Sequence, residues 1–343
     1  LRCHEKNNEE PLKAVVGYDH RSHVNFNLCS RQFAMYTKLV FEHAGIECIL
    51  LDGYVATPIL AYAVTNNTNA AVGVMVTASH NPKKDDGYKV YWKDGCQIRP
   101  PMDKGIADAI VEKENLAPWI DYGEKLQKLK AESTGEECCG FSNPIQTRSI
   151  VDAYFQSILA SGLVSKINDD ATTAPPKFAY TAMHGVGYPF AKGSFETFNL
   201  PPFLSVPSQQ DPDPNFSTVP FPNPEEKGAL DIAKSFAVEN ECDIVLANDP
   251  DADRLGVAEY SKEDDKWTVF TGDQLGTLLG HWLWETIGKQ SGKVSAAHSC
   301  FPTTSCRTRP LCYHSLLPCV PRRYLLKCYQ QWAKPRDSVL RRR

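Results

Sequence analysis

The fold class follows from one stretch near the amino terminus, Leu12-Lys13-Ala14-Val15-Val16-Gly17-Tyr18-Asp19-His20-Arg21, in which an apolar run ends in polar residues. A run of this kind is typical of a buried β-strand that ends in a loop. Apolar residues at helical spacing follow it as far as a stop at Gly45, and Ile46 to Leu51 is a second apolar run. This alternation predicts a βαβ unit and a mainly parallel sheet.

A third apolar run, Ala70 to Val76, leads directly into Thr77-Ala78-Ser79-His80-Asn81-Pro82. In open α/β sheets, ligands bind beyond the carboxyl ends of the strands. Arg21 and Ser79 therefore both lie where we expect a functional site.

The pattern begins again after a helix-rich stretch, 101–129, and a polar linker, 132–139. Strands are predicted at Phe178 to Thr181 and at Asp243 to Ala247, with a proline-rich loop, 211–226, between them. We therefore expect consecutive mixed, mostly parallel-sheet α/β domains. Their predicted bounds are 1–145 for domain 1, 146–263 for domain 2, 264–290 for the start of a truncated domain 3 and 291–343 for a basic, Cys-rich tail.

Asp249-Pro250-Asp251-Ala252-Asp253 places three carboxylates on alternate residues directly after a predicted strand. Alternate residues of an extended loop can converge on one hard cation, which indicates Mg²⁺ or Ca²⁺. An EF-hand is excluded, because Arg254 and Tyr260 stand where its loop requires Gly and Glu. A solvated acidic turn is the alternative that the sequence leaves open.

Two other motifs do not predict the chemistry that they suggest at first. Ser79 and His80 are neighbours in an extended segment, so their side chains point in opposite directions and cannot readily pair as nucleophile and base. The segment that begins His184-Gly185-Val186-Gly187 has Phe190 where a dinucleotide-binding turn needs its third glycine. We interpret these glycines as a tight turn between a strand and a helix.

Three motifs together resemble the α-D-phosphohexomutase superfamily. The segment from Val76 to Tyr91 is similar to the family's phosphoserine loop, the segment from Asn248 to Arg254 to its metal loop, and Gly17-Tyr18-Asp19-His20-Arg21 to its first-domain arginine motif. The proline-rich loop resembles that of the phosphoglucomutase-2 and phosphopentomutase branch. Relative to the family pattern, we expect the first strand element and domain 4 to be missing.

The resemblance implies an isomerase of carbohydrate metabolism that works by phosphotransfer. Ser79 would carry a phosphoryl group and pass it to a sugar monophosphate through a bisphosphate intermediate. The products would be ribose 5-phosphate or hexose 6-phosphate, formed from the 1-phosphates; glucose 1,6-bisphosphate synthesis is the alternative activity. The implied cofactors are Mg²⁺ and a sugar bisphosphate such as glucose 1,6-bisphosphate, which acts as an activator.

The same resemblance assigns roles to single residues. Lys89 and His80 are candidates for proton transfer or charge stabilisation, and Arg21 is a candidate phosphoryl clamp. Substrate-binding residues are expected at Arg254 and Asn81. The implied metal ligands are Ser79, Asp249, Asp251 and Asp253.

Composition sets the remaining expectations. The chain has 343 residues, of which 42% are hydrophobic, and it contains no apolar run of the roughly 20 residues that a membrane helix needs. We expect a cytoplasmic protein with reduced cysteines that binds sugar phosphates, not membranes or nucleic acid. The oligomeric state stays open. The chain begins with Leu1, so a preceding segment is also left open.

The carboxyl-terminal segment differs in charge from the rest of the chain. From Ser291 to Arg343 there are 11 Lys and Arg against one acid, Asp337, which gives +10 there and −14 over the preceding residues of a chain of net charge −4. Its cysteines form no CxxC pair, which argues against a zinc module. A second hypothesis is therefore an inactive product, a binding or decoy protein whose basic tail contacts acidic surfaces or nucleic acid.

Overall fold

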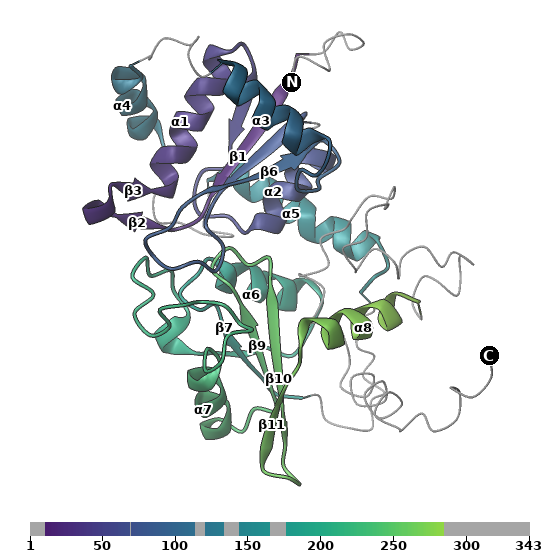
Figure 1. Cartoon of the computed structure of the whole chain (residues 1–343). Coiled ribbons are helices and arrows are strands. Elements are labelled where there is room, and N and C mark those ends of the chain that lie inside the picture. The colour runs from purple at the N-terminus through teal and green to yellow at the C-terminus, as the bar shows by residue number, and fades with distance from the viewer. Residues whose placement is uncertain (1–10, 69, 114–120, 134–143, 165–175, 285–343) are drawn as a thin grey trace, which may run out of the picture.

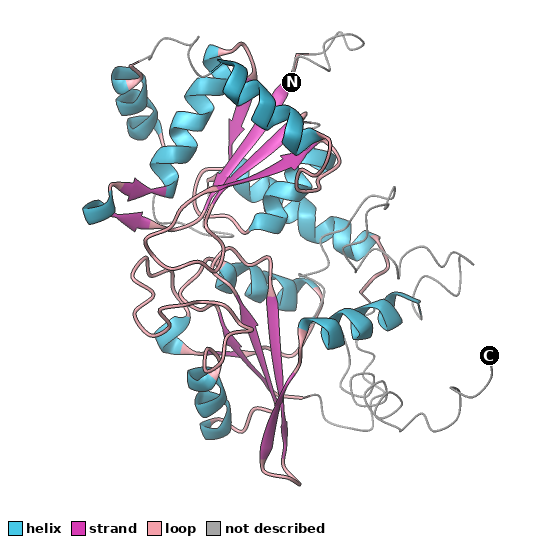
Figure 2. Ribbon diagram, viewed as in Figure 1, coloured by secondary structure: helices cyan, strands magenta, loops and turns pink. Residues whose placement is uncertain are grey.

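The computed structural model describes residues 11–68, 70–113, 121–133, 144–164 and 176–284, which form two α/β units around two sheets (Figures 1 and 2). The expected basic tail, 291–343, lies outside the described residues, as does the end of the expected domain 3. Within the described ranges, no helix is long and apolar enough to cross a membrane.

The first sheet has the strand order β4 (Glu47–Leu50), β1 (Lys13–Tyr18), β5 (Val72–Val76) and β6 (Tyr88–Trp92). Strand β1 pairs in parallel with both β4 and β5, whereas β6 runs antiparallel to β5. The parallel βαβ unit predicted from the first apolar runs is confirmed. The antiparallel edge strand matters for the site, because it carries Lys89 opposite Met75.

Helices cover both faces of this sheet. Val16 of β1 packs in one buried cluster with Ala34 of α1 (Ser30–His43), while its neighbour Val15 packs in another with Leu60 of α2 (Thr57–Tyr62). Successive strand residues point to opposite faces, so the continuous apolar run serves two helical layers. The other short elements of this unit are the 3₁₀-helix Val24–Phe26, the π-helix Ala63–Asn67, β2 (Ser22–His23), β3 (Leu28–Cys29), α3 (Met102–Lys113) and α4 (Gly123–Glu132).

The second sheet has five strands, in the order β11 (Lys266–Val269), β10 (Leu255–Ser261), β9 (Ile244–Asn248), β7 (Phe178–Thr181) and β8 (Leu204–Ser205). Strand β7 is parallel to β8 and β9, and β10 is antiparallel to β9 and β11. Strand β11 lies in the range expected to begin domain 3. A short hairpin returns the chain beside β10, where Trp267 lies opposite Tyr260, and β11 is thus the edge strand of the second sheet.

Helices also cover both faces of the second sheet. Ala233 of α7 (Asp231–Glu239) packs in a cluster with Val245, and the opposite face packs against α6 (Gly187–Thr197) and α8 (Gly272–Leu283). Helix α8 begins with a capping box, in which Thr271 and Gln274 satisfy each other's backbone N–H groups. A further 3₁₀-helix spans Pro207–Gln209.

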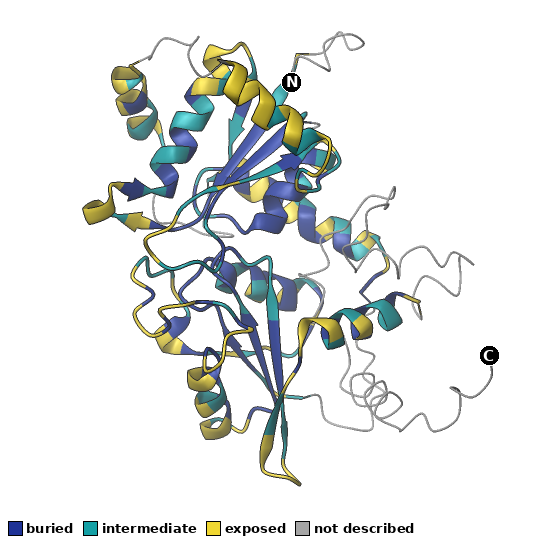
Figure 3. Cartoon of the chain, in the orientation of Figure 1, coloured by how far each residue is buried: buried dark blue, intermediate teal, exposed yellow. Residues whose placement is uncertain are grey.

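Helix α5 (Ile145–Ala160) joins the two units (Figure 1). The Tyr62 hydroxyl donates to the Ala153 carbonyl at 3.1 Å on the first-unit side, and the Phe155 ring meets Phe198 of the second unit edge-on at 6.5 Å. One buried cluster includes residues of both units, and Figure 3 shows segments coloured as buried in both units at this junction. Truncation of a buried aromatic of this kind typically costs about 3–5 kcal/mol, so the shared core stabilises the contact between the two units.

Candidate active site

Ser79 lies in the loop that follows β5, with 8% of its surface exposed and a backbone φ of 55°. This left-handed conformation costs a residue with a Cβ roughly 1–2 kcal/mol, so surrounding contacts must hold it. Its N–H donates to Thr77 Oγ1 at 2.9 Å, and its hydroxyl donates to Asp249 Oδ2 at 3.0 Å. The structure thus brings the predicted phosphoserine against the predicted metal loop.

Arg21 lies beneath the Ser79 loop and is 1% exposed. Its guanidinium donates to Asp19 Oδ2 at 3.1 Å and to four backbone carbonyls at 2.7–3.1 Å, those of Ser79, Asn81, Pro82 and Asp85. All five N–H groups of the side chain are therefore engaged. This is the arrangement of a positioning residue, and it leaves no N–H for the phosphoryl contact that the sequence suggested.

The acidic loop follows β9 and brings three carboxylates together. One oxygen each from Asp249, Asp251 and Asp253 lies within 4.8 Å of the others, and the first two residues are fully buried. Asp251 Oδ1 is buried and has no hydrogen-bond partner among the described residues. A buried carboxylate oxygen without a partner is costly, and all-oxygen donors suit a hard divalent cation. The residues present therefore fit the expected Mg²⁺.

Two residues of the first unit reach the acidic loop. Lys89 Nζ lies 2.6 Å from an oxygen of Asp251 and 2.6 Å from one of Asp253. Thr57, the first residue of α2, donates its hydroxyl to Asp251 Oδ2 in a short hydrogen bond, and its N–H donates to the Asp251 carbonyl at 2.9 Å. Residues of the first unit thus hold the metal loop of the second unit in place.

The charges of the cluster are only partly compensated. Burial, followed by the charges of Asp251 and Asp253, raises the pKa of Asp249, and burial raises the pKa of Asp253 to about 6. Burial also opposes ionisation of Asp251, but Lys89 outweighs it and lowers the pKa of that carboxyl. For Lys89, burial is likewise outweighed by the two carboxylates, so its pKa is raised and the ammonium is held charged.

The remaining predicted site residues surround these groups. The His80 ring packs edge-on against Phe221 at 5.7 Å, and burial together with the charge of Arg254 lowers its pKa, so the imidazole is neutral. Asn81 contributes its carbonyl to Arg21. Arg254 has 39% of its side chain exposed, and its Nε lies 3.9 Å from Asp249 Oδ2.

Three further residues support the site and were not assigned a role from the sequence. Asp19 accepts hydrogen bonds from Arg21, Ser30 and Thr77, and Thr57 binds the metal loop. Gly185 lies so close to that loop that an added Cβ would stand 2.3 Å from Pro250 Cα. The tight glycine turn was a usable signal for Gly185, whereas no local pattern marks Thr57.

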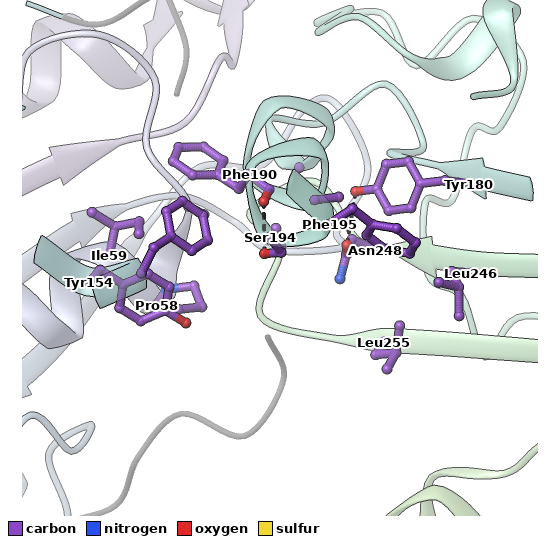
Figure 4. Close-up of a pocket in the computed structure, with 15 residues that line it drawn as sticks. Pro58, Ile59, Tyr154, Tyr180, Phe190, Ser194, Phe195, Leu246, Asn248 and Leu255 are labelled. Carbon is purple, nitrogen blue, oxygen red and sulfur yellow. Dashed lines mark hydrogen bonds between the residues drawn. The ribbon is translucent and has the colours of Figure 1, made fainter. Parts of the chain in front are cut away.

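A cavity of about 60 Å³ lies beside the metal loop, between α2, α5 and α6 (Figure 4). Phe190 and Phe195 line it, and Tyr180 donates to Asn248 at 2.9 Å on its wall. At about 60 Å³ it is much smaller than the roughly 300–1,000 Å³ of a small-molecule pocket, so it reflects packing between these elements and not a sugar-phosphate site.

The fold and the site define a class: two α/β units in which a loop serine from one faces an acidic loop from the other. Comparison with known proteins agrees. Residues 2–117 match the model of phosphoglucomutase/phosphomannomutase α/β/α domain I, and residues 152–262 match that of α/β/α domain II. The chain belongs to the phosphoglucomutase/phosphomannomutase family.

Two human proteins and one solved structure show how far the similarity extends. The chain is 39% identical over 292 residues to human phosphopentomutase, covering 85% of this chain and 45% of that protein. It is 38% identical over 280 residues to human glucose 1,6-bisphosphate synthase, covering 81% and 42%. A solved phosphoglucomutase/phosphomannomutase family protein from Burkholderia thailandensis superposes with a TM-score of 0.53 at 21% identity, covering 80% of this chain and 51% of that one. The chain thus spans about half the length of these relatives.

Proposed function

We propose that this protein is an intramolecular phosphotransferase that interconverts a sugar 1-phosphate with ribose 5-phosphate or a hexose 6-phosphate. The observation that carries the proposal is the 3.0 Å hydrogen bond from the Ser79 hydroxyl to Asp249, at the edge of the acidic cluster. A nucleophilic hydroxyl at a hard-cation site is what phosphoryl transfer requires. The similarity to human phosphopentomutase supports a pentose phosphate as substrate.

The residues take the following roles in the proposed reaction. The bond between phosphorus and Ser79 Oγ breaks as phosphorus bonds to a sugar hydroxyl. The neutral His80 imidazole accepts the proton of that hydroxyl, and the charged Lys89 donates one to the departing Ser79 oxygen. Arg254, which is partly exposed, and the Asn81 side chain bind the sugar phosphate. Arg21 holds the loop so that Ser79 keeps its position.

Asp249, Asp251 and Asp253 would hold Mg²⁺, together with an oxygen of the Ser79 phosphate. When bound, the cation supplies neutralisation of the charge on the transferring group. Two observations support this assignment: Asp251 Oδ1 is buried without a hydrogen-bond partner among the residues that the structure describes, and the pKa of Asp249 is raised. The free thiols of the buried Cys48 and Cys242 are consistent with the reducing cytoplasm in which we place the protein.

The experiment measures phosphate on Ser79. The chain is incubated with Mg²⁺ and glucose 1,6-bisphosphate, and peptides are analysed by mass spectrometry, with turnover of ribose 1-phosphate and glucose 1-phosphate measured in parallel. Ser79→Ala should remove both signals, whereas Ser149→Ala, which changes an exposed serine on α5, should keep them. Phosphate on another residue, or turnover that survives Ser79→Ala, would overturn the proposal.

The second candidate function is glucose 1,6-bisphosphate synthesis, which the similarity to the human glucose 1,6-bisphosphate synthase favours. Net formation of the bisphosphate from glucose 1-phosphate and an acyl phosphate donor would support it. Turnover of either sugar 1-phosphate without net bisphosphate formation would favour the mutase.

A further inference from the structure

Asp86 lies at the end of the Ser79 loop, one residue after the last carbonyl that Arg21 holds. It is half-buried, and its Oδ1 accepts the Gly87 N–H at 2.8 Å. Its other oxygen, Oδ2, lies 3.0 Å from the hydroxyl oxygen of Ser30, the first residue of α1. Asp86 is thus the contact between the end of this loop and the beginning of that helix.

A count of protons shows that this contact needs one more hydrogen than the serine can supply. The Ser30 hydroxyl has a single proton, and its shorter contact, 2.6 Å, is to Asp19 Oδ1. Asp19 also accepts from Arg21 and from Thr77, so it acts as a carboxylate acceptor and has no proton to give. If Asp86 were ionised, its Oδ2 and the Ser30 hydroxyl oxygen would therefore lie 3.0 Å apart with no hydrogen between them.

We propose that Asp86 is protonated in the folded protein and donates a hydrogen bond to Ser30, which ties the end of the Ser79 loop to α1. The hydrogen bonds then run in one direction, from Asp86 to Ser30 and from Ser30 to Asp19. Asp86 is a positioning residue, and its effect on Ser79 rests on the proposed function. Its side chain contacts neither the acidic cluster nor Ser79 among the described hydrogen bonds.

The electrostatic surroundings support this protonation. The charged groups that face Asp86 are Asp19 and Arg21, both after β1, and α1 presents the Ser30 hydroxyl. Burial, followed by the charge of Asp19, raises the pKa of Asp86 to about 7, against the opposing effects of Gly87, Ser30 and Arg21. The hydrogen bond from Asp86 to Ser30 is therefore formed at acidic pH and is lost as the pH rises through about 7.

The sign of the pH effect follows from proton linkage. An Asp in an unfolded chain titrates near ~3.9, so between that pH and about 7 the folded protein holds one more proton than the unfolded chain. The stability that this group contributes is fully present below the lower value and falls as the pH rises to the upper one. The folding equilibrium constant loses about tenfold per pH unit over this window.

The test compares Asp86→Asn with the wild-type chain by thermal and urea denaturation between pH 5.5 and 8.5. The amide keeps the acceptor for Gly87 and supplies a permanent donor for Ser30. The ratio of the folding equilibrium constant of Asp86→Asn to that of the wild type should therefore rise about tenfold per pH unit up to about pH 7. Asp86→Ala should be destabilised at pH 5.5. Asp85→Asn, which removes an exposed charge from the same loop, should keep the wild-type pH dependence.

Two results would overturn the proposal: a pH-independent difference between Asp86→Asn and wild type, or an Asp86→Asn protein as unstable as Asp86→Ala at pH 5.5. The rate of Ser79 phosphorylation by glucose 1,6-bisphosphate is the second readout. Above pH 7 the wild-type rate should fall about tenfold per unit relative to Asp86→Asn. If the melting pattern appears but neither protein is phosphorylated, the hydrogen bond stands and the proposed function fails.

Discussion

Replacement of Arg21 tests whether this side chain builds the site from beneath. Arg21→Met keeps the apolar volume of the side chain but removes the charge beside Asp19 and the donors to four carbonyls. Removal of one partner from a buried ion pair typically costs about 3–5 kcal/mol. Since domains unfold at roughly 5–15 kcal/mol, this change would remove a large part of the stability.

The assay is urea denaturation followed by tryptophan fluorescence. With an m-value of about 2–3 kcal/mol/M, the midpoint of Arg21→Met should fall by about 1–2.5 M. Arg148→Met changes an exposed arginine on α5 and should leave the midpoint nearly unchanged, because surface substitutions usually stay within about 0.5 kcal/mol.

Arg21→Lys separates positioning from stability. Lysine keeps a charge near Asp19 but has three donors in place of five, so at least two of the five acceptors, which are Asp19 and the four loop carbonyls, lose their partner. The protein should fold, yet the loop that holds Ser79 should shift, and a misplacement of about 1 Å can slow a reaction about a hundredfold. A folded Arg21→Lys protein that is phosphorylated at the wild-type rate, or an Arg21→Met protein with the wild-type midpoint, would refute the positioning role.

Two further substitutions test how the metal loop is held. In Gly185→Ala the new Cβ would meet Pro250 backbone atoms at 2.3–2.7 Å, so the metal loop must move. The free energy of unfolding, measured by urea denaturation, should fall by about 1–3 kcal/mol. Added Mg²⁺ should also raise the melting temperature of this variant less than that of the wild type. Gly276→Ala on α8 meets nothing within 4 Å and should stabilise the protein by about 0.5–1 kcal/mol; equal effects at the two glycines would contradict the account. Thr57→Val removes the hydrogen bond to the buried Asp251 and should cost about 1.5–3 kcal/mol, whereas Thr57→Ser should melt close to wild type; equal losses in both would show that the hydroxyl is not what matters.

From the residue pattern alone, the α/β class could be predicted, as could the positions of Ser79 and the acidic loop directly after buried strands. These are local properties, because a buried strand is apolar along its length and a loop that follows it is polar. The residue pattern does not predict helix α2, because its six residues are too few to show a helical period. The pairing of β11 with β10 could not be predicted either, because it depends on a hairpin and not on the residues of the strand itself.

Which of these residues come into contact depends on the tertiary structure. Ser79 and Asp249 are 170 residues apart, and Lys89 and Asp251 are 162 apart, so their contact depends on how two sheets pack through α5 and a shared core. The contacts of Arg21 also depend on the tertiary structure, whereas the family resemblance suggested a phosphoryl contact for it. Its burial beneath four carbonyls commits it to the loop, because a buried guanidinium must satisfy its donors with whatever acceptors the fold provides.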